Sequence, residues 1–382
     1  MLRRWDRKIS NWLETRWVTP AYAGWLLGFL TLFFFGAATN TMAGWLYVIS
    51  GMGLAVLLAA AILPARSLVP LKIRRHPIAP VSVGDRLAVE VEVDNPSRQP
   101  RALLQVVDRL PPELGEAKRA IEVIAPGETY RWSYFLPTRR RGIYHWPGVW
   151  LRTAAPLGLF WCSRDRNVPA TAIVYPTVLP LASCPLLDAV GDDQGPQIYE
   201  RDRLHLATEG MTRTLRPYRY GDPTRLIHWR TSARYGELRV RELEVAIQGQ
   251  DIAICLDSAF SWDEADFETA VSVAASLYFY ASRAQYQVQL WTAKTGLVRG
   301  NWTVLGVLAG VEAGETPAIA DPPNLPLIWI TQNPETLATL PPRSRWLLWP
   351  AGENFRSDRL PCPGIAIDST QPLIPQLQSS PV

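Results

Sequence analysis

The sequence predicts a multidomain protein with an N-terminal two-helix transmembrane hairpin, an antiparallel β-sandwich and a C-terminal α/β domain. Three patterns predict these parts: a long stretch without charge, a period-two alternation of apolar and polar residues, and apolar strands that alternate with helices. The chain has 382 residues, 48% of them apolar, which suffices for two or three domains. We place the hairpin at residues 1–65, the β-sandwich at 66–180, a connector with a polar sequence motif at 181–250 and the α/β domain at 251–382.

The charge-free stretch lies between Arg16 and Arg66. It contains two apolar runs, at about residues 21–38 and 43–63, and a membrane-spanning helix needs roughly 17 to 25 such residues. Basic residues flank both ends of this hairpin, which by the positive-inside rule places both termini in the cytoplasm. We therefore expect a two-pass membrane protein; a cleaved signal peptide is the alternative for the first run alone.

A period-two pattern begins after the hairpin. Leu87, Val89, Val91 and Val93 alternate with small or charged residues, as in a strand with one buried face. Further strands are expected at residues 102–107, 120–124, 129–136, 142–146, 149–153 and 172–175. Short strands separated by Pro and Gly turns predict an antiparallel β-sandwich. The basic run at residues 139–141 is either a solvated edge or a contact for anionic lipid or nucleic acid.

The last third of the chain reads as strand, helix, strand. An apolar strand at residues 252–256 precedes a helix at residues 264–283 with one apolar stripe. Further strands are expected at 288–292, 327–331, 346–349 and 365–367, and helices at 304–312 and 334–339. This order predicts a mostly parallel sheet covered on both faces. Ligands of such sheets bind at the carboxyl ends of the strands, where Asp257 lies.

The sequence DSAFS at residues 257–261 resembles the D-x-S-x-S metal loop of von Willebrand factor type A domains. Ala259 replaces the first serine, and Gln332 stands where such domains commonly have an acidic residue after a later strand. Asp257 and Ser261 therefore remain as candidate ligands of a degenerate Mg²⁺ site. The alternative is that Asp257 only caps the following loop and helix.

Enzyme motifs are absent from the sequence. It has no P-loop, no G-x-G-x-x-G and no H-E-x-x-H motif. Asp222, His228 and Ser232 can be written as a triad, but they fall within eleven residues and lack a G-x-S-x-G elbow. The four cysteines are widely spaced and form no C-x-x-C pair, which predicts core thiols in a reducing compartment.

The most basic part of the chain is residues 213–244. Eight arginines and four acidic residues give this segment a charge of +4, equal to the net charge of the whole chain, so nucleic-acid binding is not expected. Apolar and aromatic side chains between the charges predict a segment anchored in a core: Tyr218, Tyr220, Ile227, Trp229 and Val240. The sequence of residues 221–223, Gly-Asp-Pro, predicts a turn.

Three arginines of this segment, Arg225, Arg230 and Arg234, would share a face if residues 223–233 form a short helix. Guanidinium groups bind carboxylates with two parallel hydrogen bonds. The arginines therefore either pair with acidic residues of the same segment or bind an acidic partner. Because the segment lies between two domains, it is predicted to be a structural brace whose surplus arginines can face a partner.

The sequence GDPTRLIHWRTSAR, followed by RVRELE, resembles the bacterial family called domain of unknown function 58. The positions that match the family pattern are Tyr220, Gly221, Asp222, Arg225, Ile227, Trp229, Ala233, Arg234, Arg241, Glu242 and Glu244. Upstream segments at residues 141–144, 156–160 and 174–176 are also similar to the family. The resemblance implies a membrane-anchored protein of the bacterial inner membrane with a degenerate von Willebrand type A-like (Rossmann-like) domain.

The resemblance also implies a function. Members of the family are associated with MoxR-type AAA+ ATPases, which are linked to the assembly or maturation of other proteins, and the family has no established catalytic residue. We therefore expect a non-enzymatic adaptor or scaffold that acts with such an ATPase on client proteins and needs no cofactor. The alternative is a cytoplasmic enzyme that uses the Asp257 loop with a divalent metal such as Mg²⁺.

Overall fold

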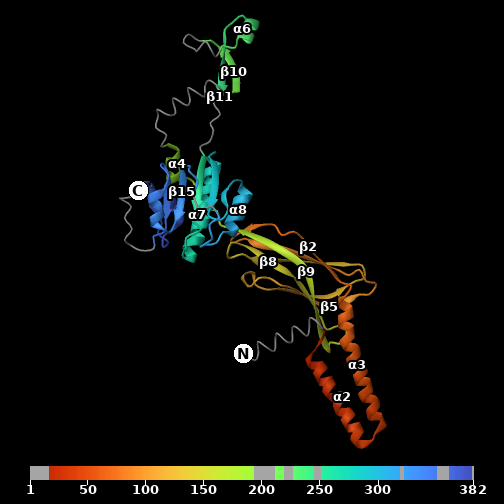
Figure 1. The fold of residues 1–382 in the computed structure, drawn as a ribbon. Coiled ribbons are helices and arrows are strands. Elements are labelled where there is room, and N and C mark those ends of the chain that lie inside the picture. The colour runs from red at the N-terminus through yellow and green to blue at the C-terminus, as the bar shows by residue number, and fades with distance from the viewer. Residues whose placement is uncertain are drawn as a thin grey trace. The chain divides into compact units, whose positions relative to one another are not determined.

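The computed structural model describes residues 17–192, 211–218, 227–244, 251–318, 322–350 and 361–380. The chain divides into two compact units, Met1–Tyr175 and Pro176–Val382. Figure 1 shows a pair of long helices and antiparallel strands in the first unit, and a mixed sheet with helices in the second. Each unit is built around a hydrophobic core of its own.

The helical pair of the first unit consists of α2 (Tyr22–Thr41) and α3 (Gly44–Leu68). Both helices are long and apolar enough to cross a membrane, by length and composition. Large apolar side chains cover their outer surfaces, among them Phe29, Leu32 and Val48. The predicted pair of apolar helices is therefore present.

The turn between the helices is shorter than expected. Helix α2 continues through the polar residues Thr39 and Thr41, which the sequence placed in the turn. Their hydroxyl groups donate to the carbonyl oxygens of Gly36 and Ala37, both at 2.8 Å, so the helix itself satisfies them. Met42, with a φ of 53°, ends the helix in the left-handed conformation.

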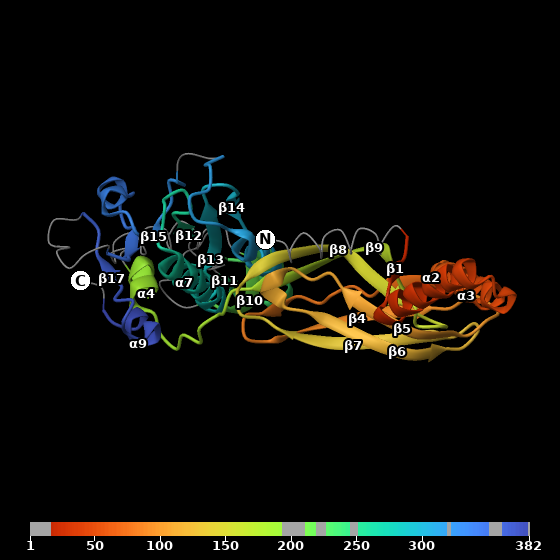
Figure 2. The ribbon, with the colours of Figure 1, turned by 90° about the horizontal axis from the view of Figure 1, so that it is seen from below.

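Two sheets bury a common core in the first unit. One has the order β1-β9-β8-β5-β6, with β3 paired to β9, and the other has the order β2-β4-β7. The strands are β1 (Thr19–Pro20), β2 (Lys72–Arg75), β3 (Val81–Ser82), β4 (Arg86–Asp94), β5 (Arg101–Asp108), β6 (Ala117–Ile124), β7 (Thr129–Pro137), β8 (Gly142–Thr153) and β9 (Phe160–Tyr175). Figure 2 shows these strands running lengthwise away from α2 and α3. Leu87, Val89, Val91 and Val93 of β4 all face the core, as their alternation predicts.

Several strands of this unit differ from the prediction. The segments 142–146 and 149–153 form one strand, β8, with a register shift between Trp146 and Gly148. Strand β9 begins at Phe160, well before the predicted residue 172. Its first half carries charged side chains and is held by backbone pairing to β8, so hydrophobic alternation does not reveal it. Strand β2 lies in a segment that reads as a linker.

A buried ion pair connects the two sheets. The Arg75 guanidinium on β2 contacts both carboxylate oxygens of Asp108 on β5, at 2.9 and 2.8 Å, and the side chains are 3% and 0% exposed. The Tyr134 hydroxyl on β7 donates to the same carboxylate at 2.5 Å. Burial, followed by the Asp108 charge, raises the pKa of Tyr134 far above its usual value. Arg75 also lies over the Trp146 ring, 5.2 Å from its centroid.

The second unit contains a six-stranded sheet in the order β14-β13-β12-β15-β16-β17, parallel except for β14. Its strands are β12 (Asp251–Leu256), β13 (Gln287–Thr292), β14 (Gly296–Val298), β15 (Leu327–Thr331), β16 (Arg345–Leu348) and β17 (Gly364–Ala366). The helices are α4 (Pro185–Asp192), α7 (Glu264–Arg283), α8 (Asn301–Gly310) and α9 (Leu373–Leu377), and η3 (Pro334–Thr339) is a 3-10 helix. Antiparallel β14 and α4 were not expected from the sequence.

Both faces of this sheet are buried. Alternate residues of β12 enter two different clusters: Ile252 and Ile254 pack with α4, α7, α8 and α9, whereas Ala253 and Cys255 pack with η3. A strand buried on both faces has no polar alternation, which is why its sequence is apolar throughout. The predicted, mostly parallel sheet is therefore confirmed for this part of the chain.

The four cysteines are core thiols, as predicted. Cys162, Cys184, Cys255 and Cys362 are all free and buried. Burial raises the pKa of Cys184 to about 11, so its thiol stays protonated at neutral pH and is a poor nucleophile.

The Arg75–Asp108 pair leads to a stability prediction. Asp108→Ala leaves the Arg75 charge buried without its partner and is expected to cost about 3 to 5 kcal/mol of unfolding free energy. The control is Asp165→Ala, which removes a carboxylate from a half-exposed pair with Arg109 at 2.7 Å and should cost less than about 1 kcal/mol. Urea unfolding of the full chain in detergent, followed by tryptophan fluorescence, measures both; equal losses would contradict the role of the buried pair.

Candidate functional site

The sequence motif is framed by a two-stranded antiparallel sheet. Strand β10 (Met211–Pro217) pairs with β11 (Arg239–Glu244). Three motif residues have defined strand partners: Arg241 faces Leu215, Glu242 faces Thr214 and Glu244 faces Met211. Four others, Tyr220, Gly221, Asp222 and Arg225, lie outside the described residues.

Between these strands lies the short helix α6 (Trp229–Tyr235). It begins at His228, whose Nδ1 accepts the backbone N–H of Thr231 at 3.2 Å and lies 2.7 Å from the Thr231 hydroxyl. It ends at Gly236, which adopts a φ of 70° and donates to the Ser232 carbonyl at 3.0 Å. The helix therefore starts six residues later than the predicted residue 223, because the imidazole cap sets its first turn.

Ser232 joins this helix to β11. It is buried, and its hydroxyl donates to the carbonyl of His228 at 3.1 Å and accepts the backbone N–H of Arg239 at 2.8 Å. His228 in turn donates its backbone N–H to the Arg239 carbonyl at 2.8 Å. His228 and Ser232, two members of the triad written from the sequence, thus use their polar atoms in local backbone contacts.

Aromatic and basic side chains cover the outer side of α6. Ile227 and Val240 are buried and pair with each other, as predicted for core positions. Trp229 differs from the prediction: it follows the cap and is 65% exposed instead of serving as a core anchor. Arg230 and Arg234 are one helical turn apart and exposed. We call Trp229, Arg230, Arg234 and Tyr235 the α6 surface.

Tyr235 on this surface is also exposed, and its ring is covered by a neighbouring arginine. The guanidinium carbon of Arg239 lies 4.5 Å from the centroid of the Tyr235 ring. Such stacking restricts the arginine side chain, and it costs the weakly hydrated guanidinium group little hydration. The result is a small area where planar cationic groups and aromatic rings meet.

Asp257, at the carboxyl end of β12, is buried and hydrogen-bonded within the protein. Its carboxylate accepts the Thr331 hydroxyl of β15 at 2.8 Å. Burial raises the pKa of Asp257, and bonds from Thr331 and the Phe260 N–H partly oppose this shift. The Asp257 carbonyl also accepts the indole N–H of Trp262 at 2.7 Å. The side chain holds the loop, whereas α7 is capped by Asp263, so the expectation that Asp257 caps this helix is wrong.

The neighbouring polar residues tie this loop to α7. The Gln332 amide oxygen accepts the Asp263 N–H at 3.0 Å, and its nitrogen donates to Asp266 at 3.0 Å. Ser369 donates to the other oxygen of Asp266 at 2.6 Å. Ser261, the second candidate ligand, is exposed. The Gln332 amide therefore cross-links the Asp257 loop to the first turn of α7.

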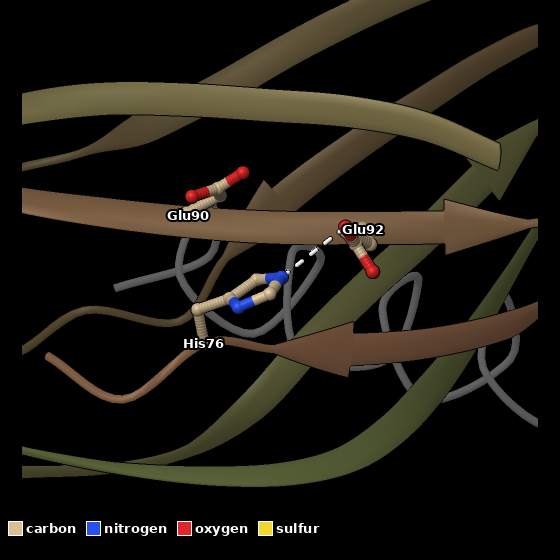
Figure 3. A group of neighbouring side chains, drawn as sticks. All are labelled: His76, Glu90 and Glu92. Carbon is tan, nitrogen blue, oxygen red and sulfur yellow. Dashed lines mark ion pairs between the residues drawn. The ribbon is translucent and has the colours of Figure 1, made fainter.

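A third polar group lies on the outer face of β2 and β4. His76, Glu90 and Glu92 place one ligand atom each within 4.8 Å of one another (Figure 3). The imidazole Nε2 lies 3.2 Å from Glu92, as the dashed line in Figure 3 marks. The hydrogen bond from His76, followed by that from Arg131, lowers the pKa of Glu92.

Arg131 supplies the positive charge of this group. It contacts Glu90 at 2.9 Å and Glu92 at 3.0 Å from the adjacent strand β7. An ion-pair network explains the arrangement without a metal. Sequence reasoning missed the group because β2 reads as a linker; the outward positions of Glu90 and Glu92 in the period-two pattern were the signal that could have indicated part of it.

The Asp257 geometry leads to a prediction on metal binding. Because the folded-state pKa is raised, the protonated carboxyl stabilises the fold fully below about pH 3.8, and this contribution is lost as pH rises through the raised value. Asp257→Asn should remove this dependence, so that the variant gains thermal stability relative to the native chain as pH rises. Mg²⁺ should leave both melting temperatures unchanged. A melting temperature that Mg²⁺ raises in the native chain but not in Asp257→Asn would reveal a metal site.

Comparisons with known proteins give a related sequence and partial structural likenesses. Uncharacterized protein YeaD of Bacillus subtilis (strain 168) is 27% identical over 200 residues, which are 51% of this chain and 48% of that protein. The match thus spans about half the length of that relative. Two solved structures also resemble part of the chain: red sea bream transglutaminase, with 14% identity over 28% of this chain and 15% of that one, and the CARDB domain of PF1109 from Pyrococcus furiosus, with 15% identity over 28% and 94%.

Both structural likenesses have a TM-score of 0.21, and likenesses at this level identify neither fold nor function. The family model described as "Protein of unknown function DUF58" matches residues 214–299. The matched region runs from β10 through α6 and β11 to β14 and so contains all the motif residues and the Asp257 loop. The family model and the motif therefore point to the same family over this region of the chain.

Proposed function

We propose that this protein is a two-pass membrane adaptor without enzymatic activity, which uses the α6 surface to bind a protein partner. The observation that carries the proposal is the contrast between two groups of side chains at α6. Its histidine and buried serine are engaged in backbone contacts, whereas Trp229, Arg230 and Arg234 point to solvent. Tryptophan, tyrosine and arginine are the residues that contribute most to protein interfaces.

Membrane insertion is supported by the surface of α2 and α3. Their outward side chains include Trp25, Phe29 and Phe33, each more than half exposed. Each buried apolar side chain is worth about 1.5 to 3 kcal/mol relative to exposure to water. A bilayer therefore gives these helices a favourable environment, and the basic residues on either side of the hairpin favour cytoplasmic termini in the inner membrane.

The proposed partner is a MoxR-type AAA+ ATPase. This assignment rests on the DUF58 family resemblance, and it agrees with a sequence that has no P-loop of its own. Guanidinium groups on α6 suit an acidic patch on such an ATPase or on a client protein. In this arrangement the ATPase supplies the energy, and the membrane protein supplies location and recognition during assembly or maturation of clients.

The alternative of a metal-dependent enzyme that uses the Asp257 loop receives less support. The Asp257 carboxylate already accepts two hydrogen bonds, and Gln332 offers an amide that is itself engaged on both sides. A divalent cation would have to displace these contacts and find further oxygen ligands, because Mg²⁺ demands near-octahedral coordination.

The adaptor proposal predicts partner binding through α6. The double variant Trp229→Ala and Arg234→Ala removes an aromatic and a cationic contact. It is expected to weaken binding of a purified MoxR-type ATPase from the same organism by about 1000-fold, since two interface hot spots of about 2 kcal/mol each contribute about 4 kcal/mol. Biolayer interferometry with the full chain in detergent measures the affinity for the ATPase.

The matched control for this experiment is Arg299→Ala. It removes an exposed arginine that forms a pair with Asp251 at 3.0 Å, away from α6 in sequence, and should leave the affinity unchanged. An ATPase that binds the α6 double variant as tightly as the native chain would remove the α6 surface from the proposal. Weakening by all three substitutions alike would indicate nonspecific attraction between charges.

Topology is tested separately. A reporter that is active only in the cytoplasm, fused after Val382, should be active, and one fused into the turn at Met42 should be inactive. The reason is the excess of arginine and lysine on both flanks of the hairpin. Activity of the Met42 fusion alone would contradict the proposed orientation.

A further inference from the structure

The helical hairpin joins the sheets of the first unit through very short connections. Only Ala21 separates β1 from α2, and three residues separate the end of α3 from β2. Leu68 and Leu71, at this second connection, are both buried in the core that the two sheets share. The helices therefore continue directly into the sheets without a flexible linker.

Specific contacts hold this junction. The Ala21 N–H donates to the Leu159 carbonyl at 2.8 Å, and a Cβ at Gly24 would lie only 2.2 Å from the same oxygen, so this approach requires glycine. On the other helix, the Arg166 side chain donates to the Leu68 carbonyl at 2.6 Å and thereby satisfies a free carbonyl of the last turn of α3. The bases of both helices are thus fixed against the start of β9.

Basic and aromatic residues gather at this junction. Trp161 pairs with Thr19, three residues before α2, and the Arg152 guanidinium carbon lies 4.3 Å from the centroid of its ring. Arg164 donates to the Trp17 carbonyl at 3.4 Å. Arg152 and Trp161 lie on one face of β8 and β9, and Arg164 and Arg166 lie on the other. We call the following six residues, which lie around the base of the hairpin, the juxtamembrane surface: Trp17, Arg66, Arg152, Trp161, Arg164 and Arg166.

We propose that the juxtamembrane surface binds the phosphate groups of anionic phospholipids. The proposal rests on the proposed membrane insertion, which places the ends of α2 and α3 at the level of the lipid headgroups. Arginine binds phosphate through parallel hydrogen bonds, and tryptophan is favoured at the membrane interface. The acidic neighbour Asp165 is paired with Arg109 at 2.7 Å, so the surface keeps a positive charge.

The basic run at residues 139–141, which the sequence offered as a lipid contact, lies elsewhere in the unit. It precedes β8, whose 12 residues lead from Gly142 to Thr153 at the junction. At about 3.3 Å per residue, the strand separates the two ends by roughly 40 Å. This distance exceeds the reach of an arginine side chain, so the expected lipid contact of this run is not supported by its position.

The experiment compares two double variants of the full chain in detergent. Arg152→Gln with Arg164→Gln is expected to weaken binding of phosphatidylglycerol by about 30-fold, since each basic residue near an anionic surface contributes about 1 kcal/mol. Arg139→Gln with Arg140→Gln removes the same charge at the far end and should leave binding unchanged. Native mass spectrometry counts bound lipid, with phosphatidylcholine as the neutral comparison.

A further double variant and a folding control keep the result interpretable. Arg152→Lys with Arg164→Lys retains the charge and should retain most of the binding, and the melting temperature of each variant shows whether it is folded. Equal loss in both glutamine double variants or equal binding of both lipids would overturn the proposal. Carbonate extraction tests insertion independently: a chain released by carbonate would refute membrane insertion, whatever the lipid titration gives.

Discussion

The buried pair of Arg75 and Asp108 is the constraint on which the first unit depends. A buried charge without its partner would strongly destabilise the core. Strands β2 and β5 must therefore place Arg75 and Asp108 opposite each other. A slip of β2 by one residue would turn Arg75 outward and bring Arg74 into the apolar interior. Because α3 leads into β2 after three residues, the same pair also determines where the helical hairpin meets the sheets.

In the second unit, polar groups at the strand ends stabilise loops. Asp257, Thr331 and Gln332 come from the ends of β12 and β15, the place where parallel sheets commonly bind ligands. Here each of them has a partner within the protein, and Gln332 links the loop to the first turn of α7. Helix α6, by contrast, carries exposed aromatic and basic side chains, which suit recognition of a partner.

Much of the fold could be predicted because hydrophobic period reports burial directly. Strand β4 is buried on one face and strand β12 on both faces. Each was recognisable from its apolar positions alone. The first half of β9 was not, since it carries charged side chains and is held by backbone pairing to β8 and β1. Helix α6 was misplaced because its first turn depends on an imidazole cap, a contact that residue propensity does not encode. The exposure of Trp229 and the engagement of Asp257 are tertiary properties and required the structure.

The short connections at the base of the hairpin have a consequence for the order of folding during synthesis. Helices α2 and α3 are adjacent in the sequence and can associate as soon as both have left the ribosome. Thr19, however, pairs with Trp161, so β1 stays without its partner until β9 has been made. Contacts between distant segments form slowly because a long loop must close first. Docking of the hairpin base onto β9 is therefore a late step, which completes the first unit only after nearly all of its strands exist.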